Sequence, residues 1–238
     1  MSKALTGVSL LQKGKGKALL FLHGYLSNKE SFSAQIAYFS RFYRVIAIDF
    51  LGFGQSQPLT KPFSVGDYAE WLFQILQELG VEKPHIIAHS FGCRVAVKVA
   101  GKYPSAFDKI VLTGPAGVIL NRGLAYRIKV KAYRLVKRIA PRFAESKFGS
   151  KEYRSLSPIM KESYKKIVNE DLRKCAGQVC NEVLIVQGKT DTVTTEKEAL
   201  AYLSAFPNAR LSYIDGGHFA FAENPTQFCL QVEEFLYE

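Results

Sequence analysis

The sequence lacks any apolar run of the roughly 18 to 20 residues that a transmembrane helix requires. Its first seven residues, up to Gly7, do not follow the charged-then-apolar plan of a secretory leader, so we expect a cytoplasmic protein. Internal repeats and low-complexity segments are also absent from the printed sequence. The length of 238 residues then suits one α/β domain with an insertion.

Cysteine is scarce and is not arranged as in metal sites. The four cysteines, Cys93, Cys175, Cys180 and Cys229, form no CxxC pair and have no histidine cluster beside them, which argues against zinc. We expect reduced, mostly buried thiols, with Cys93 packing inside a helix. The glycine-rich loop 49–56 is not followed closely by a helix start, which argues against a phosphate-cradling loop. No metal or organic cofactor is therefore expected.

Positive charge is concentrated in one segment of the chain. Residues 121–174 contain 16 of the 32 Lys and Arg residues but only 5 of the 21 Asp and Glu residues, so they account for the whole net charge of +11. A neutral body with a basic insert argues against nucleic-acid binding. Two interpretations stay open: a solvated helical face, or recruitment of anionic lipid at a membrane surface or of an acidic substrate. Vesicle binding that did not weaken with added salt would contradict the second.

Short apolar runs alternate with helical patterns along most of the chain. Strands are predicted at 8–12, 18–22, 45–48, 84–87, 110–113, 183–187 and 210–214, and helices at 29–42, 65–79, 91–102, 196–206 and 225–236. This alternation predicts an α/β fold with a doubly wound, mostly parallel sheet. Function in such sheets gathers at the carboxyl ends of the strands.

The alternation stops at Gly114 and resumes near residue 179. Between them the sequence is basic and helical, with a second helical part at about 157–174. We therefore predict a core made of residues 1–114 and 179–238, with an inserted basic helical cap at 115–178.

Ser90 lies where an apolar strand pattern ends and a helical pattern begins. A tight turn at this junction needs small residues on both sides of the serine, and Ala88 and Gly92 meet that need. Such a pentapeptide also arises by chance as an ordinary strand-to-helix turn. The residues at the other predicted strand ends are needed to distinguish these two interpretations.

A serine hydroxyl needs a base to remove its proton and a third group to orient that base. Of the four histidines, only His218 follows Ser90, and it comes directly after a predicted strand and two glycines. Asp191 stands on a loop at another strand end and is the favoured orienting acid. Asp215, three residues before His218, is the alternative.

An oxyanion that develops on a substrate carbonyl requires backbone N–H donors. The N–H of Phe91 at the start of a helix and the N–H of Tyr25 after a strand are the predicted donors. The chain order Ser90, Asp191, His218 matches the order found in α/β-hydrolases.

Five motifs occur at matching points in the strand-helix order. They are Leu22-His23-Gly24, Asp49-x-x-Gly52-x-Gly54-x-Ser56, the turn at Ser90, Gly188-x-x-Asp191 and Gly217-His218. Along nearly its full length the chain resembles an α/β-hydrolase fold protein with a short helical cap. Ala88 replaces the more usual first glycine of the turn, and the first strand of the usual sheet is truncated. Serine at position 90 separates the chain from the similar haloalkane dehalogenases and epoxide hydrolases, which use aspartate.

The resemblance implies a serine hydrolase that cleaves an ester-like bond of a small molecule. The basic segment adds the expectation that this molecule could be anionic or lipid-like. The alternative is a carbon–carbon bond hydrolase or a lyase, because Arg94 matches a carboxylate-binding arginine of the menaquinone-pathway synthase that the chain resembles. Arg94 is equally interpretable as an ordinary helix residue, and His89 is a further candidate for substrate binding. A non-catalytic ligand receptor on the same fold is the third alternative; tight binding of a small molecule without hydrolysis would favour it.

Overall fold

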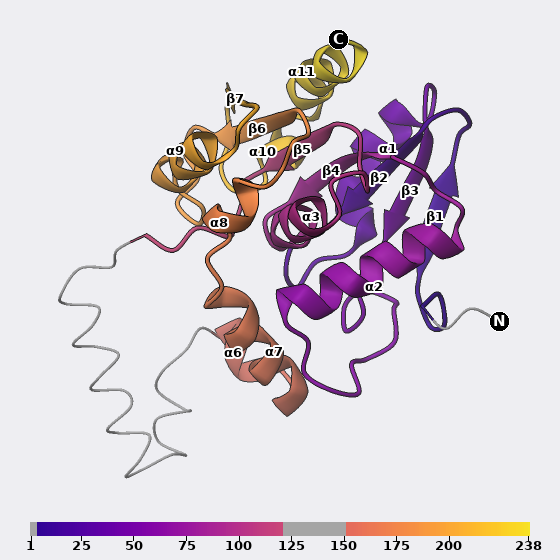
Figure 1. Ribbon diagram of the computed structural model, residues 1–238, viewed down its shortest axis with the longest axis vertical. Helices are drawn as coiled ribbons and strands as arrows, with labels where there is room; N and C mark the ends of the chain where they lie inside the picture. Colours follow the sequence, from indigo (N-terminus) through magenta and orange to yellow (C-terminus); the bar gives the residue numbers. More distant parts are fainter. Residues whose placement is uncertain (1–3, 121–150) are drawn as a thin grey trace.

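The computed structural model describes residues 4–120 and 151–238 (Figure 1). Its centre is a seven-stranded sheet in the order β1-β3-β2-β4-β5-β6-β7. The strands are β1 (Leu10–Lys13), β2 (Ala18–Leu22), β3 (Arg44–Ile48), β4 (His85–His89), β5 (Ile110–Thr113), β6 (Val183–Gly188) and β7 (Ala209–Ile214). Every neighbouring pair is parallel except β1 and β3, which run antiparallel. The predicted fold class is confirmed.

The central strands are mostly apolar and almost wholly buried because both faces of the sheet are covered. In β2, Leu20 and Leu22 point into one hydrophobic core, whereas Leu19 and Phe21 point into the other, as the two-residue period of a strand requires. All four side chains are buried. The chain therefore carries a core on each side of one sheet.

Helices cover both faces and make three layers (Figure 1). One face is covered by α2 (Val65–Glu78), α3 (Phe91–Lys102), α8 (Arg173–Ala176) and α9 (Glu196–Ala205), and the other by α1 (Ser33–Phe39), α10 (Ala220–Glu223) and α11 (Pro225–Tyr237). A capping box between Ser64 and Asp67 fixes the start of α2. Because β2 to β7 run parallel, their carboxyl ends lie at the same edge of the sheet, between the two helical layers.

The structure divides two of the predicted helices. The 29–42 helix is a short 3-10 helix, η1 (Lys29–Phe32), followed by α1, and the 157–174 helix ends early as α7 (Pro158–Val168), with α8 separate from it. Another short helix, α6 (Lys151–Ser155), precedes α7. Residues 121–150 of the predicted cap lie outside the described residues, so the division into core and cap stays a prediction. Within the described residues, no helix is both long enough and apolar enough to span a membrane.

Candidate active site

Ser90 occupies a strained turn between β4 and α3. Its backbone has φ 49° and ψ −106°, a region that non-glycine residues rarely adopt and that costs on the order of 1–3 kcal/mol. Gly92 makes the turn sterically feasible, since a Cβ added there would lie 2.4 Å from the carbonyl oxygen of Leu22. Ala88, on the other side, is completely buried. The turn thus presents the serine at the end of the central strand.

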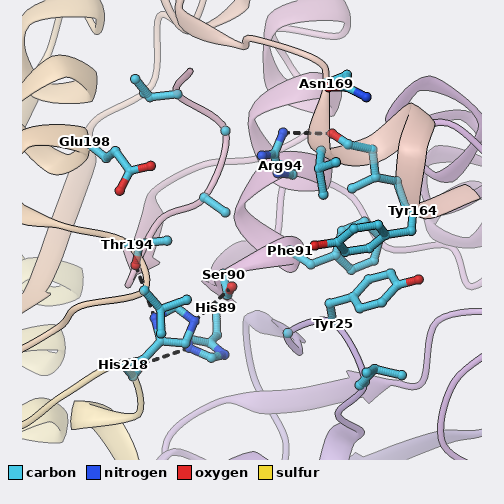
Figure 2. A pocket seen from close by; sticks show the side chains of 18 of the residues that line it. Tyr25, His89, Ser90, Phe91, Arg94, Tyr164, Asn169, Thr194, Glu198 and His218 are labelled. Carbon is cyan, nitrogen blue, oxygen red and sulfur yellow. Dashed lines mark hydrogen bonds between the residues drawn. The ribbon is translucent and has the colours of Figure 1, made fainter. Parts of the chain in front are cut away.

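His218 lies between Ser90 and Asp191, and Figure 2 shows its approach to Ser90. Its Nε2 is 3.0 Å from Ser90 Oγ, and its Nδ1 is 2.9 Å from Asp191 Oδ2. A glycine allows the two loops that carry this pair to come together, because a Cβ on Gly188 would lie 2.2 Å from the carbonyl oxygen of Gly217. The structure therefore brings together the three residues that the sequence analysis selected.

Asp191 is held by several donors besides His218. The N–H groups of Val193 and Thr194 donate to Oδ1 at 2.8 and 3.0 Å, and the Thr194 hydroxyl donates to Oδ2 at 2.8 Å. Burial alone would raise the pKa of Asp191, but the bonds from His218 and from the Thr194 N–H outweigh it and lower the pKa. The carboxylate is therefore ionised at neutral pH.

Asp215 is directed away from this cluster. Its carboxylate pairs with Lys189 at 2.7 Å, and both side chains are more than half exposed. Of the two acids that the sequence analysis weighed, Asp191 is the one bonded to His218.

The predicted oxyanion donors belong to two segments beside Ser90. Phe91 opens α3, where the first N–H groups have no acceptor within the helix. Tyr25 follows β2, and its neighbour Gly24 lies against the nucleophile, since a Cβ added there would lie 3.5 Å from Ser90 Cβ. Both Tyr25 and Phe91 line the same cavity as Ser90. Their role as oxyanion donors stays a prediction.

The neighbouring histidines are buried and neutral. His89 donates through Nε2 to the carbonyl oxygen of His218 at 2.9 Å, and burial, followed by the charge of His218, lowers the pKa of His89 to about 3. His23 donates through Nδ1 to the carbonyl oxygen of Gly24 and accepts the N–H of Phe50 at Nε2. Both rings therefore support the loops around Ser90.

A cavity of about 650 Å³ opens above Ser90 and His218. Aromatic rings form part of its wall: Tyr25 packs against Tyr164 at a centroid distance of 5.2 Å, and Tyr164 packs against Tyr153 at 5.3 Å. The cavity volume is in the range of small-molecule sites.

Among the residues that the structure describes, two charged side chains reach the cavity wall, Arg94 from α3 and Glu198 from α9 (Figure 2). The Nη1 of Arg94 donates to the carbonyl oxygens of Ile167 and Glu170, both at 2.9 Å. Arg94 is thus tied to the end of α7 and also faces the cavity, which leaves both interpretations of this residue open.

Sequence reasoning missed Thr194, Glu198 and Tyr164. Thr194 is three residues after Asp191, and this spacing was the only available signal. Glu198 on α9 and Tyr164 on α7 reach the cavity through the packing of their helices.

All four cysteines are free. Cys93 is buried, as predicted, and burial raises the pKa of its thiol. Cys229 is buried too, whereas Cys180 is exposed and Cys175 is half-buried, so burial was predicted too broadly. Among residues 4–120 and 151–238, no group of three or more metal-ligating side chains occurs.

Comparison with known proteins agrees with the fold described above. Residues 17–137, about half of the chain, match the family model described as alpha/beta hydrolase fold. The chain belongs to the α/β-hydrolase family and is an enzyme.

The individual relatives and solved structures that resemble the chain share only a modest part of its sequence. A 2-hydroxymuconate semialdehyde hydrolase of Pseudomonas putida is 27% identical, with 97% of this chain and 90% of that protein covered. An uncharacterised protein of Mycobacterium tuberculosis is 26% identical, with coverage of 94% and 76%. An esterase from Exiguobacterium antarcticum has a similar structure, with a TM-score of 0.79, 20% identity and coverage of 97% and 96%.

Proposed function

We propose that the protein hydrolyses an ester-like bond of a small molecule through a covalent acyl-enzyme. The observation that carries this proposal is the hydrogen-bonded series from Ser90 Oγ through both ring nitrogens of His218 to the ionised Asp191, at the floor of a cavity. A serine, a base and an orienting acid in this geometry are the parts that nucleophilic acyl transfer needs.

In the first half of the reaction, Ser90 Oγ attacks the substrate carbonyl carbon while its proton passes to His218 Nε2. Asp191 holds the Nδ1–H and stabilises the imidazolium. The N–H groups of Tyr25 and Phe91 bind the oxygen that becomes negative. When the tetrahedral intermediate collapses, the alcohol leaves with the proton from Nε2, and the acyl group stays on Ser90.

In the second half, a water molecule gives a proton to His218 Nε2 and attacks the acyl carbon. Collapse of the second intermediate breaks the bond to Ser90 Oγ, which regains its proton from Nε2. The carboxylic acid then leaves the cavity. The aromatic wall provides apolar contact area for the acyl or alcohol group.

A second candidate is cleavage of a carbon–carbon bond, or elimination, on a substrate that carries a carboxylate. Arg94 favours it, because no other lysine or arginine of the described residues lines the cavity. The relative from Pseudomonas putida is named for a muconate semialdehyde, and muconate is itself a carboxylate. Buried guanidinium groups are well suited to carboxylate recognition.

The first test is labelling and turnover. A fluorophosphonate probe should modify Ser90, as located by mass spectrometry, and a panel of p-nitrophenyl esters should be hydrolysed. Ser90→Ala should abolish labelling and lower kcat by about 10³-fold or more. Cys93→Ala, three residues away and buried behind the turn, should keep both activities. Retention of ester hydrolysis by Ser90→Ala would contradict the proposal.

The carboxylate binding on which the second candidate depends is tested with Arg94→Met and two ester substrates. One is a neutral diester, and the other is the matching half-ester with a free carboxylate. If Arg94 binds the carboxylate, KM for the half-ester should rise about 10- to 100-fold, the range expected for lost hydrogen bonds to a charged group, while the diester is little affected. Equal losses on both substrates would assign Arg94 to anchoring α7 instead.

A further inference from the structure

Thr194 makes a polar contact with each of two members of the Ser90 site. Its Oγ1 is 2.8 Å from Asp191 Oδ2 and 3.1 Å from His218 Nδ1, and these two atoms are themselves 2.9 Å apart. Figure 2 shows the contact between Thr194 and His218. The three atoms therefore form a closed triangle. Thr194 is 5% exposed, so bulk water has little access to compete for these contacts.

Proton counting fixes the direction of each hydrogen bond. An ionised carboxylate only accepts, so the single hydroxyl proton of Thr194 goes to Asp191. The lone pairs of Thr194 Oγ1 then remain for the proton on His218 Nδ1. That proton is shared between the carboxylate of Asp191 and the hydroxyl oxygen of Thr194.

The backbone of Thr194 is held by hydrogen bonds that do not involve His218. Gln187, which is completely buried in β6, donates through Nε2 to the carbonyl oxygen of Thr194 at 2.9 Å. The Thr194 N–H donates to Asp191 Oδ1 at 3.0 Å. These bonds fix the backbone that carries the hydroxyl without a contribution from the imidazole, as a preorganised support requires.

We propose that Thr194 is a positioning residue that keeps His218 protonated at Nδ1 with Nε2 directed at Ser90. A histidine held by two acceptors at Nδ1 has less freedom to rotate away from the serine than one held by the carboxylate alone. The shared bond also strengthens when His218 becomes an imidazolium, because charge-assisted hydrogen bonds are stronger than neutral ones. The inference rests on the proposed function of Ser90 and His218.

The test uses variants at two threonines of the same loop. Thr194→Val keeps the shape and removes the hydroxyl, Thr194→Ala removes it with a smaller side chain, and Thr194→Ser retains it. Thr192→Val is the matched control, since Thr192 is exposed. The measurements are the second-order rate of fluorophosphonate labelling at Ser90, and kcat and KM on a p-nitrophenyl ester that the wild type hydrolyses.

Thr194→Val and Thr194→Ala should lower both the labelling rate and kcat by about 10-fold, the effect of one lost hydrogen bond to a charged partner, with KM unchanged. Thr194→Ser should recover most of the loss, and Thr192→Val should match the wild type. If Thr194→Val fails to fold, Thr194→Ala carries the comparison.

Three results would overturn the inference. They are wild-type rates in both variants without the hydroxyl, equal impairment of Thr194→Ser and Thr194→Val, and a raised KM with unchanged kcat. Wild-type protein that is not labelled at Ser90 would instead overturn the proposed function on which the inference rests.

Discussion

Asp191 receives more hydrogen bonds than orientation of His218 alone would need. Two backbone N–H groups and a hydroxyl fix both carboxylate oxygens, so the acid stays ionised although it is buried. An acid held in this way presents a constant negative charge to His218 Nδ1. A substitution that keeps the shape of the Asp191 side chain and removes its negative charge therefore tests the role of the charge alone.

Asp191→Asn should lower kcat on an ester substrate by about 10³- to 10⁴-fold, because an amide stabilises neither the required tautomer nor the imidazolium. Asp215→Asn is the matched control. It removes only an exposed ion pair with Lys189, whose contribution to stability is about 0–1 kcal/mol, and kcat should stay within about twofold. A large loss in Asp215→Asn together with an active Asp191→Asn would reverse the assignment of the acid.

At the scale of elements, the turn between β4 and α3 depends on how closely the helix approaches β2. The carbonyl oxygens of Leu22 and His23 lie 2.4 and 2.9 Å from the position of a Cβ on Gly92. Both are backbone atoms, so no side-chain rotation relieves the clash. The helix start and the strand would have to separate.

Gly92→Ala should therefore destabilise the protein by about 1–3 kcal/mol, the usual cost of overpacking. For a chain of this size each kcal/mol corresponds to about 2–4 °C in Tm, measured by circular dichroism. Gly177→Ala is the control, since its nearest heavy atom lies at 3.6 Å and its φ is −63°. A Tm shift of Gly92→Ala no larger than that of the control would mean that the turn tolerates a side chain.

Much of this arrangement follows from local pattern. The apolar runs of β2 and β6 predicted both strands with their observed starts, at Ala18 and Val183, because a parallel strand buried on both faces is mostly apolar. The residues Ser90, Asp191 and His218 were predictable because each directly follows a strand or lies in the loop after one. The family resemblance added the expected order.

The parts that were not predicted depend on tertiary contacts. In the sequence, Glu198 is recognisable only as part of the capping box at the start of α9. The packing of that helix against the sheet brings it to the cavity. The four-residue helix α10 is too short for a periodic pattern to reveal. The Thr194 contact with His218 joins residues 24 apart, and nothing in the threonine's own neighbourhood specifies the partner.

At the scale of the whole molecule, histidine burial couples stability to pH. Burial lowers the pKa of His23, and it lowers the pKa of His89 to about 3. At His85, burial and then the charge of Lys17 lower the pKa to about 4. The rings of His85 and His89 therefore stay neutral in the folded protein under mild acid, whereas histidines in the unfolded chain take up protons near pH 6.5. Acidification therefore favours unfolding before most carboxylates begin to titrate.

His85→Gln tests this coupling away from the active site. The folded-state pKa of His85 lies below its unfolded value, so its contribution to stability is complete above about pH 6.5 and is lost as pH falls toward 4, by up to about 1.4 kcal/mol per pH unit. The glutamine oxygen can still accept the Lys109 N–H that His85 Nδ1 accepts at 3.2 Å. Free energies of unfolding in urea should therefore fall less steeply from pH 6.5 to 4.5 in His85→Gln than in the wild type. Parallel curves over that range would show that His85 takes up its proton equally in both states.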